Sequence, residues 1–438
     1  MQGLVEEIVA KARMHGATDA IAILERSDAH QVKFANSEIA AVKSWLDTSL
    51  LIYFAAGQRV VSAVVSDLSR VDSVLSNLEK SAKSAPENKD FHGIAGGKFK
   101  YADVPMDKRI VSMEDRLTDL TWEGINAAEK EGAKRCAGVM HRYHHVRYMR
   151  SSQGLGYRDE SAALAFSIRA FNDEGGAGHS VSCASNMDSF APAEAGKEAG
   201  ETCILARSPS LGEEGMHNVL LTHLSAADIA LHTAAFASAS RVDAGLSFLK
   251  DKIGAEIASP EFCLRDDGTI PGGLGSRCAD DEGVPTQSTE IIKDGRLLSY
   301  LHNTSTAVKH DTSTTANAGL VHPRPWNVLV VPGEMRRAEI LEEMGSGYLI
   351  SNVWYTRFQN YLTGDYSTIP RDAMLRVKDG RIAGAVKGMR VSDNMERMLK
   401  HIVALGREQR QIYWWEIEIP TFVPEMLIRD VRISRSTM

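Results

Sequence analysis

The sequence lacks a long uninterrupted hydrophobic run, and no segment reaches the roughly 18 apolar residues that a membrane-spanning helix needs. It also lacks a strong excess of one charge, because 50 Lys and Arg residues stand against 57 Asp and Glu residues, a formal net charge of −7. A chain with that balance has no general basic field to attract phosphate backbones. We therefore expect neither a membrane nor nucleic acid as a direct partner.

Cysteine is scarce, and its spacing matches no metal or redox motif. The five residues are Cys136, Cys183, Cys203, Cys263 and Cys278. They are odd in number, and no pair has the CxxC spacing of a zinc or redox site. Buried free thiols in a reducing compartment explain them. Because Met1 leads directly into an amphipathic helix without the basic start and apolar block of a secretion signal, we expect a cytoplasmic protein.

The composition is that of a globular protein with two or three domains: 438 residues, 43% of them hydrophobic and 24% charged. In the first half, amphipathic helices alternate with short strand-like segments that end at turn residues. Helices are predicted at 4–15, 68–84 and 117–131, and strands at 20–24, 32–36, 39–43, 49–55, 59–65, 136–143, 145–151 and 161–171. Helix followed by meander thus occurs twice, which predicts an α+β fold.

The main domain boundary is predicted after a small-residue helix at 193–206, where the chain passes Ser208-Pro209 and reaches an acidic turn. Strand-length segments punctuated by glycine follow, together with a long helix at about 225–240. The predicted parts are an N-terminal α+β domain at 1–212, with sub-parts at about 1–85 and 107–205, and a β-rich C-terminal domain at 213–438.

Three histidines close together, His141, His144 and His145, suggest a metal site, because neutral imidazole is the commonest metal ligand. On a strand, however, His141 and His145 share one face while His144 lies on the other. No carboxylate or thiol lies at ligand spacing nearby. The pattern is therefore interpreted as the solvated edge of a hairpin.

His223 and His232 lie near the start of the predicted long helix. Nine residues at about 100° each place them on opposite helix faces, so they cannot bind one ion together. Ser225 and Asp228 have the spacing of a capping box, with a hydroxyl at the cap and an acid three residues later. All four residues are therefore interpreted as structural.

Two loop segments could also carry chemistry. The glycine-rich segment 271–276 lacks the Lys-Ser/Thr ending of a phosphate-binding loop, which favours an ordinary loop with positive backbone angles. Asp280, Asp281 and Glu282 could hold a hard cation or form an acid–base pair. Alternation along an extended segment would split them between two faces, and Gly283 indicates a turn, so a solvated acidic turn is favoured.

Thr363, Gly364, Asp365, Tyr366 and Ser367 combine hydroxyl groups, a glycine and an aromatic ring. This mixture suits contact with an extended peptide main chain, and it is equally compatible with a hairpin. The sequence has no G-x-S-x-G nucleophile elbow. Spacing alone therefore identifies no catalytic site.

Longer strings of residues resemble the TldD/PmbA family. They are the segments 258–269, 280–286 and 291–298, the Gly364-Asp365-Tyr366-Ser367 string, and Asp379-Gly380-Arg381-Ile382 followed by Val386. The order of elements also matches, so the resemblance covers nearly the whole chain. It implies the family's fold, with a helix-and-meander N-terminal region and a mostly β C-terminal domain.

The family is known as cytoplasmic zinc-dependent peptidases of unfolded peptides, usually built from two related subunits, and under older names as a modulator of DNA gyrase. Its metal-bearing TldD type carries His-Glu-x-x-x-His on the long helix and a later cysteine ligand. Those helix positions fall near Ala230, Leu231 and Ala235 here, and no cysteine follows Cys278. The resemblance is therefore to the PmbA, or TldE, type that lacks the metal motif.

This resemblance implies a non-catalytic, metal-free subunit, with zinc in a TldD-like partner, that assembles as a heterodimer or with itself as a homodimer. It would form part of a cavity and hold unfolded peptides extended along 284–289 and 362–368. The peptide-binding candidates are Asp281, Glu282, Gly283, Thr286, Thr363, Gly364, Asp365, Tyr366 and Ser367.

Two other functions stay open at the level of sequence. One is a self-sufficient homodimeric metallopeptidase with non-standard ligands, such as His223 with Asp228 or the acids at 280–282. The other is a modulator of DNA gyrase, or another protein-interaction module, although the net charge weighs against direct DNA binding. Metal analysis of the purified protein separates the first of these from the metal-free subunit.

Overall fold

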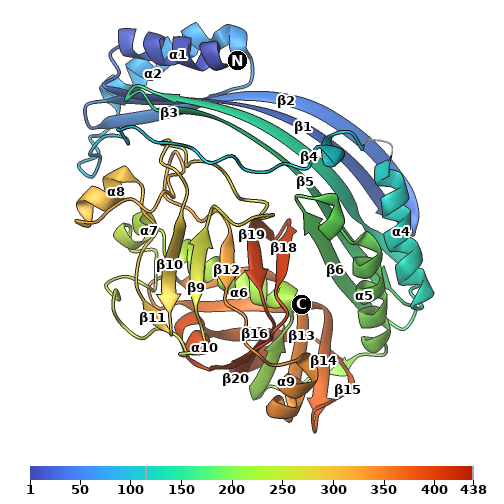
Figure 1. Cartoon of the computed structure of the whole chain (residues 1–438). Helices are drawn as coiled ribbons and strands as arrows, with labels where there is room; N and C mark the ends of the chain where they lie inside the picture. The colour runs from blue at the N-terminus through green and yellow to red at the C-terminus, as the bar shows by residue number, and fades with distance from the viewer. Residues whose placement is uncertain (114–115, 437–438) are drawn as a thin grey trace.

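The first sheet arches over the rest of the molecule as a long, curved antiparallel ribbon (Figure 1). The structure is a computed structural model that describes residues 1–113 and 116–436. The strand order of this sheet is β3-β2-β1-β4-β5-β6. Its strands are β1 (Asp19–Ala35), β2 (Glu38–Ala56), β3 (Arg59–Val65), β4 (Arg135–Ser151), β5 (Gly156–Phe171) and β6 (Ala177–Ala184).

Several of the predicted short strands are parts of single long strands, so the prediction of separate segments was wrong. The predicted strands 20–24 and 32–36 both belong to β1, 39–43 and 49–55 belong to β2, and 136–143 and 145–151 belong to β4. Most residues between them are polar, and side chains there find partners on the neighbouring strand, as Gln31 does with His141. The backbone ladder therefore continues where the apolar pattern stops.

Helices cover the two ends of the convex face of this sheet (Figure 1). At one end α1 (Gln2–Met14) and α2 (Val71–Ser84) bury Val5, Ile8 and Leu75 against apolar residues of β1 and β2. At the other end α4 (Leu117–Lys130) and α5 (Pro192–Leu205) pack on β4, β5 and β6. The remaining helical turns here are η1 (Leu68–Arg70), α3 (Lys108–Val111) and η3 (Met187–Ser189).

The chain after residue 205 forms two further sheets that lie under the concave face of the first (Figure 1). One has the order β11-β10-β9-β12-β19-β18, and the other has the order β13-β8-β20-β16-β14-β15-β7, with β17 paired to β20. Their strands are β7 (Ser210–Leu211), β8 (Gly215–Leu221), β9 (Leu264–Asp267), β10 (Ser288–Lys293), β11 (Arg296–Leu297), β12 (Val328–Val330), β13 (Gly347–Asn360), β14 (Asp365–Lys378), β15 (Arg381–Lys387), β16 (Met389–Asn394), β17 (Ile402–Leu405), β18 (Arg410–Trp414), β19 (Ile417–Val423) and β20 (Met426–Arg435).

The long helix α6 (His223–Phe236) is packed between these two sheets and is buried along most of its length. It is shorter than predicted, because the chain turns after Phe236 and continues as α7 (Ala239–Asp243). The predicted capping box is wrong: Thr222 is the N-cap residue, and the Ser225 hydroxyl donates to the Ile350 carbonyl at 2.8 Å. The other helices are α8 (Thr304–Lys309), α9 (Arg337–Met344) and α10 (Met395–Lys400).

The concave face of the first sheet meets the C-terminal part through a small apolar cluster. Ile21, Ile23 and Met149 of the sheet pack with Cys278 and Ala279. All five cysteines are free thiols, and Cys263 is the one among them that is not fully buried. Within residues 1–113 and 116–436, no helix is long and apolar enough to cross a membrane.

Helices α4 and α5 approach closely because glycine faces glycine at their contact. A Cβ atom placed on Gly196 would lie 2.0 Å from the Gly124 carbonyl oxygen. We expect Gly196→Ala to lower the free energy of unfolding by about 1–3 kcal/mol, because the helices must separate to admit the methyl group. Urea unfolding followed by circular dichroism measures the change.

The matched control is Gly3→Ala, since Gly3 is also helical but has no atom within 4 Å of the added carbon. Its stability should stay unchanged or rise by up to about 1 kcal/mol, as expected for alanine in a helix. Equal behaviour of the two variants would show that the contact between α4 and α5 tolerates a side chain at Gly196.

Candidate functional site

The polar residues of α6 fall into two separate environments. The His223 ring is buried, and its Nε2 donates to the Glu408 carbonyl at 3.1 Å. Burial lowers the pKa of His223 below its usual value. His232 lies on the other side, with Nε2 3.5 Å from Asp228 Oδ1. The helix therefore separates the two histidines, and the residue beside Asp228 is His232 and not His223.

The histidines of β4 line the middle of a sheet, so their interpretation as a hairpin edge is wrong. Strand β4 pairs with β1 on one side and β5 on the other. The concave face carries His141 and His145, with the ring of Tyr143 stacked between them at 5.2 and 6.0 Å. His144 lies on the opposite face, 2.8 Å from Glu160. Burial lowers the pKa of His141 to about 4.

The acidic segment 280–282 is buried, so its interpretation as a solvated turn is also wrong. Asp280, Asp281 and Glu282 are 0%, 4% and 7% exposed. Asp280 accepts hydrogen bonds from the backbone N–H groups of Glu282, Val284 and Ala318 at 2.9–3.1 Å. These bonds hold the turn in shape, and Gly283 completes it with a φ of +90°.

Asp281 joins this turn to the concave face of the first sheet. Its Oδ1 accepts from Arg147 of β4 at 2.8 Å and from Arg277 at 3.4 Å. Both the Arg147 and the Asp281 side chains are largely shielded from solvent, at 13% and 6% exposure. Because neither charge could stay buried without the other, the pair fixes how the turn sits on the sheet.

Glu282 faces a different pocket, where it accepts hydrogen bonds from the backbone N–H of Thr304 at 3.3 Å and from the Thr304 hydroxyl. Burial, with Asp281 nearby, raises the pKa of Glu282 to about 7. Asp280 lies next to it, and burial together with the charge of Glu282 raises the pKa of Asp280 as well. The backbone N–H donors of Val284 and Ala318 favour the ionised form of Asp280 and offset part of this rise.

A cavity of about 660 Å³ lies between the concave face of the first sheet and the loops of the C-terminal part. Tyr143 and His145 form part of one wall, and the glycine-rich segment 271–276 forms part of the opposite wall. Thr286 also lines it and donates its hydroxyl to the Arg277 carbonyl. This volume is in the range of small-molecule and short-peptide sites.

The segment 363–367 lies elsewhere, in the hairpin that joins β13 to β14. Thr363 donates to Asp365 Oδ2 at 2.6 Å, and the buried Tyr366 hydroxyl lies 2.7 Å from the Met398 sulfur. Ser367 accepts from Arg390 at 2.9 Å. Asp365 and Tyr366 line a separate pocket of about 400 Å³. The structure therefore does not bring this segment together with Thr286 around one cavity.

Sequence reasoning missed the charged residues that line or border the large cavity, Arg147, Arg277 and Arg324, and the ring of Trp326 that the last two contact. They come from strand β4 and from two loops, and no short motif contains them. The one signal in the sequence was the basic and aromatic Arg324-Pro325-Trp326 string, which has no defined meaning before the loops are placed.

Comparison with known proteins shows which family the chain resembles in sequence and structure. The sequence family described as the PmbA/TldA metallopeptidase C-terminal domain matches residues 214–435, half of the chain. The chain belongs to the PmbA/TldD metallopeptidase family. Among curated relatives, the metalloprotease PmbA homolog of Haemophilus influenzae is 32% identical over 183 residues, which are 41% of this chain and 39% of that protein.

Solved structures share the fold over the full length. TldE from Thermococcus kodakarensis has a TM-score of 0.86 at 18% sequence identity. The match covers 98% of this chain and 99% of the TldE chain. A putative modulator of DNA gyrase from Thermotoga maritima has a TM-score of 0.83 at 22% sequence identity, and the match covers 98% of this chain and 99% of that chain. These likenesses confirm the predicted α+β, TldD/PmbA-like fold. The curated relatives are matched over less than half of their own length, so they do not by themselves transfer an activity.

The zinc site of a PmbA/TldD-type metallopeptidase does not fit the residues of α6. Ala230 is buried, and Leu231 and Ala235 share the partly exposed face of His232, where they offer no donor atom. Asp228 and His232 are two donors, whereas a catalytic zinc needs three protein ligands. In the part of the chain that the structure describes, no three His, Cys, Asp or Glu residues are placed to hold a metal ion.

The raised pKa of Glu282 predicts a pH dependence of stability. A carboxyl whose pKa rises on folding, here from 4.5 to about 7, contributes stability below pH 4.5 that is lost as the pH rises to 7. We expect Glu282→Gln to remove this loss, worth on the order of 2–3 kcal/mol, because the amide oxygen can still accept from Thr304. Urea unfolding of both proteins at pH 5, 6, 7 and 8 measures it.

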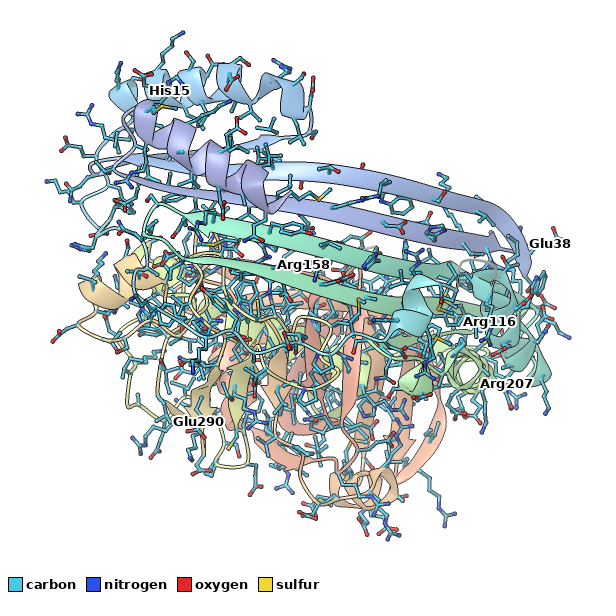
Figure 2. The ribbon with its side chains drawn as sticks, turned by 45° about the horizontal axis from the view of Figure 1, so that its top comes forward. His15, Glu38, Arg116, Arg158, Arg207 and Glu290 are labelled. Carbon is cyan, nitrogen blue, oxygen red and sulfur yellow. The ribbon has the colours of Figure 1, made fainter. Side chains whose placement is uncertain are left out.

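Glu290→Gln is the matched control, because Glu290 lies on β10 with an exposed side chain (Figure 2) and pairs with Lys293. That variant should keep the pH dependence of the unmodified protein. A Glu282→Gln protein whose stability still falls as steeply between pH 5 and 7 would place the titrating group elsewhere.

Proposed function

We propose that this chain is the metal-free subunit of a TldD/TldE-type peptidase, which forms part of the substrate cavity and holds unfolded peptides for a zinc-bearing TldD-like partner. The observation that carries the proposal is the absence of a set of three zinc ligands on α6 and elsewhere in the described residues. Where the resemblance places the zinc ligands, the chain has Ala230, Leu231 and Ala235. None of these can bind an ion or polarise water, so the metal must come with another subunit.

The cavity under the first sheet supports the peptide-holding part of the proposal. Its wall of Tyr143 and His145 is aromatic, and the facing segment 271–276 is mostly glycine, proline and leucine. Surfaces of this kind accept a main chain with varied side chains, because aromatic and apolar groups offer contact area with little side-chain selectivity. This suits a subunit that handles unfolded peptides of many sequences.

The outer edge of β2 supports the partner part of the proposal. Strand β3 pairs with residues 50–56 of β2, and no strand among the described residues pairs with the outer edge of 38–49. Figure 2 shows Glu38 at the far end of this edge. Val42 and Leu46, 62% and 57% exposed, lie on it. An unpaired edge with exposed apolar side chains is a surface for adding a strand of a partner.

Co-purification with a TldD-like chain tests the assignment. We expect this chain alone to contain far less than one zinc per molecule and to cleave no unfolded peptide such as casein. The complex should contain about one zinc per TldD-like subunit and should lose cleavage with a chelator. Zinc at one per molecule in this chain alone, with chelator-sensitive cleavage, would instead establish the self-sufficient metallopeptidase.

A double variant, Val42→Lys with Leu46→Lys, tests the edge. Two lysines on an edge strand oppose pairing by charge and desolvation, so we expect the association constant with the TldD-like chain, or with a second copy, to fall at least tenfold. Size-exclusion chromatography with light scattering measures it. Val308→Lys is the control, because Val308 is 53% exposed on α8 of the C-terminal part. Unchanged association of the double variant would exclude the edge as the interface.

A further inference from the structure

The large cavity contains a tryptophan whose ring lies next to two arginines. Arg277 and Arg324 place their guanidinium carbons 3.9 and 4.9 Å from the centroid of the Trp326 ring. The ring itself is fixed, because the Trp326 backbone N–H donates to Asp266 at 2.6 Å and its indole N–H donates to the Ala316 carbonyl at 2.8 Å. The two positive charges are therefore held at a defined place in the cavity wall.

Three acids, Asp159, Asp281 and Glu25, lie near these arginines, but among the described residues none of them forms an ion pair with Arg324. Arg147 and Arg277 share one oxygen of Asp281, and Glu25 lies 3.5 Å from His145. Among residues 1–113 and 116–436, Arg324 has no side-chain hydrogen bond and no ion pair. The buried Nε atoms of Arg147 and Arg277 also have no hydrogen-bond partner.

The surroundings of Arg324 favour an anion. Its side chain is exposed, but it is exposed into the cavity and surrounded by protein. Burial and the neighbouring charge of Arg277 lower the pKa of Arg324 below its usual value. Arginine does not lose its proton in proteins, so an anion bound at Arg324 would stabilise this charge.

The geometry favours a carboxylate over a phosphate held by backbone amides. The amide groups of the glycine-rich segment are already used within the protein: Gly273 donates to Ile270, Leu274 to Gln411, and Gly275 to Asn327. They cannot form a phosphate cradle. What remains is a planar guanidinium fork, which matches a carboxylate through two parallel hydrogen bonds.

The lining of the cavity also contains Glu418, which is exposed and has no ion pair among the described residues. Burial and the Glu418 carboxylate raise the pKa of Tyr413, and burial with Tyr413 nearby raises the pKa of Tyr143 to about 12. A positively charged group bound beside Glu418 would be stabilised by its carboxylate.

We propose that this cavity binds a short peptide with free ends, with its terminal carboxylate on Arg324 and Arg277 and its amino group at Glu418. The inference deepens the proposed function and rests on it, because it names the class of peptide that the subunit holds. The aromatic rings of Tyr143 and Trp326 contact the peptide between its ends, and the site selects for free ends over side-chain identity.

Isothermal titration calorimetry on this chain alone tests the proposal, with tetra-alanine, its C-terminal amide and its N-acetylated form as probes. Tetra-alanine should bind at least tenfold more tightly than the amide, because the amide cannot form the bidentate charged contact. Arg324→Gln should remove the difference between these two probes. Glu418→Gln should remove the difference between tetra-alanine and its N-acetylated form.

Arg26→Gln is the control, because Arg26 lies on the opposite, convex face of β1 with an exposed side chain. It should bind all three probes as the unmodified protein does. Equal affinity for tetra-alanine and its amide would overturn the proposal, as would a preference that survives Arg324→Gln. Inorganic phosphate that displaces tetra-alanine at an equal concentration would also overturn it, since the site would then be a general anion site.

This experiment separates the inference from the proposed function. Binding is measured without a partner and without zinc, whereas the proposed function is tested by zinc content and cleavage in the complex. If the complex cleaves casein but tetra-alanine does not bind, the inference alone fails. If tetra-alanine binds as expected but this chain alone holds zinc and cleaves casein, the metal-free assignment fails and the peptide site stands.

Discussion

The buried contact between Arg147 and Asp281 determines how the two halves of the molecule meet. One charge comes from the middle of β4 and the other from a loop more than 130 residues later in the chain. Removing two charges from water is costly, and the cost is recovered only when both groups reach the same place with good hydrogen-bond geometry. The small apolar cluster of Ile21, Met149 and Cys278 next to the pair excludes water from it.

Fixing that contact also shapes the cavity. The glycine-rich loop and Trp326 are tied to each other by hydrogen bonds of Asp266 and Asn327, so they form one unit. Two positions in this unit admit no side chain: a Cβ on Gly275 would lie 2.0 Å from the Trp326 carbonyl oxygen, and one on Gly268 would lie 2.7 Å from Thr286. The cavity wall formed by segment 271–276 is therefore closely packed against the loops around Trp326 and Thr286.

Helix α6 is held in place by packing and by hydrogen bonds within the protein. The helix lies between two sheets, and its alanines allow both sheets to approach closely. Its polar residues are bonded within the protein: Thr233 donates to the Ile229 carbonyl at 2.8 Å, and Thr356 donates to Asp228 at 2.8 Å. In the proposed assembly this chain supplies shape, charge and a strand edge, and the partner supplies the metal.

The sequence alone determined the helices, the α+β class and the family, because these depend on local periodicity and on strings of neighbouring residues. The stretches 4–15, 68–84 and 117–131 repeat apolar residues on one helix face, and they are helical in the structure apart from a residue or two at their ends. Only the tertiary structure decided the length of β1 and β4, the burial of Asp280, Asp281 and Glu282, and the grouping of Arg147, Arg277 and Arg324. The physical reason is that polar and charged side chains are stabilised by partners distant in sequence, so their burial cannot be read from their neighbours in the chain.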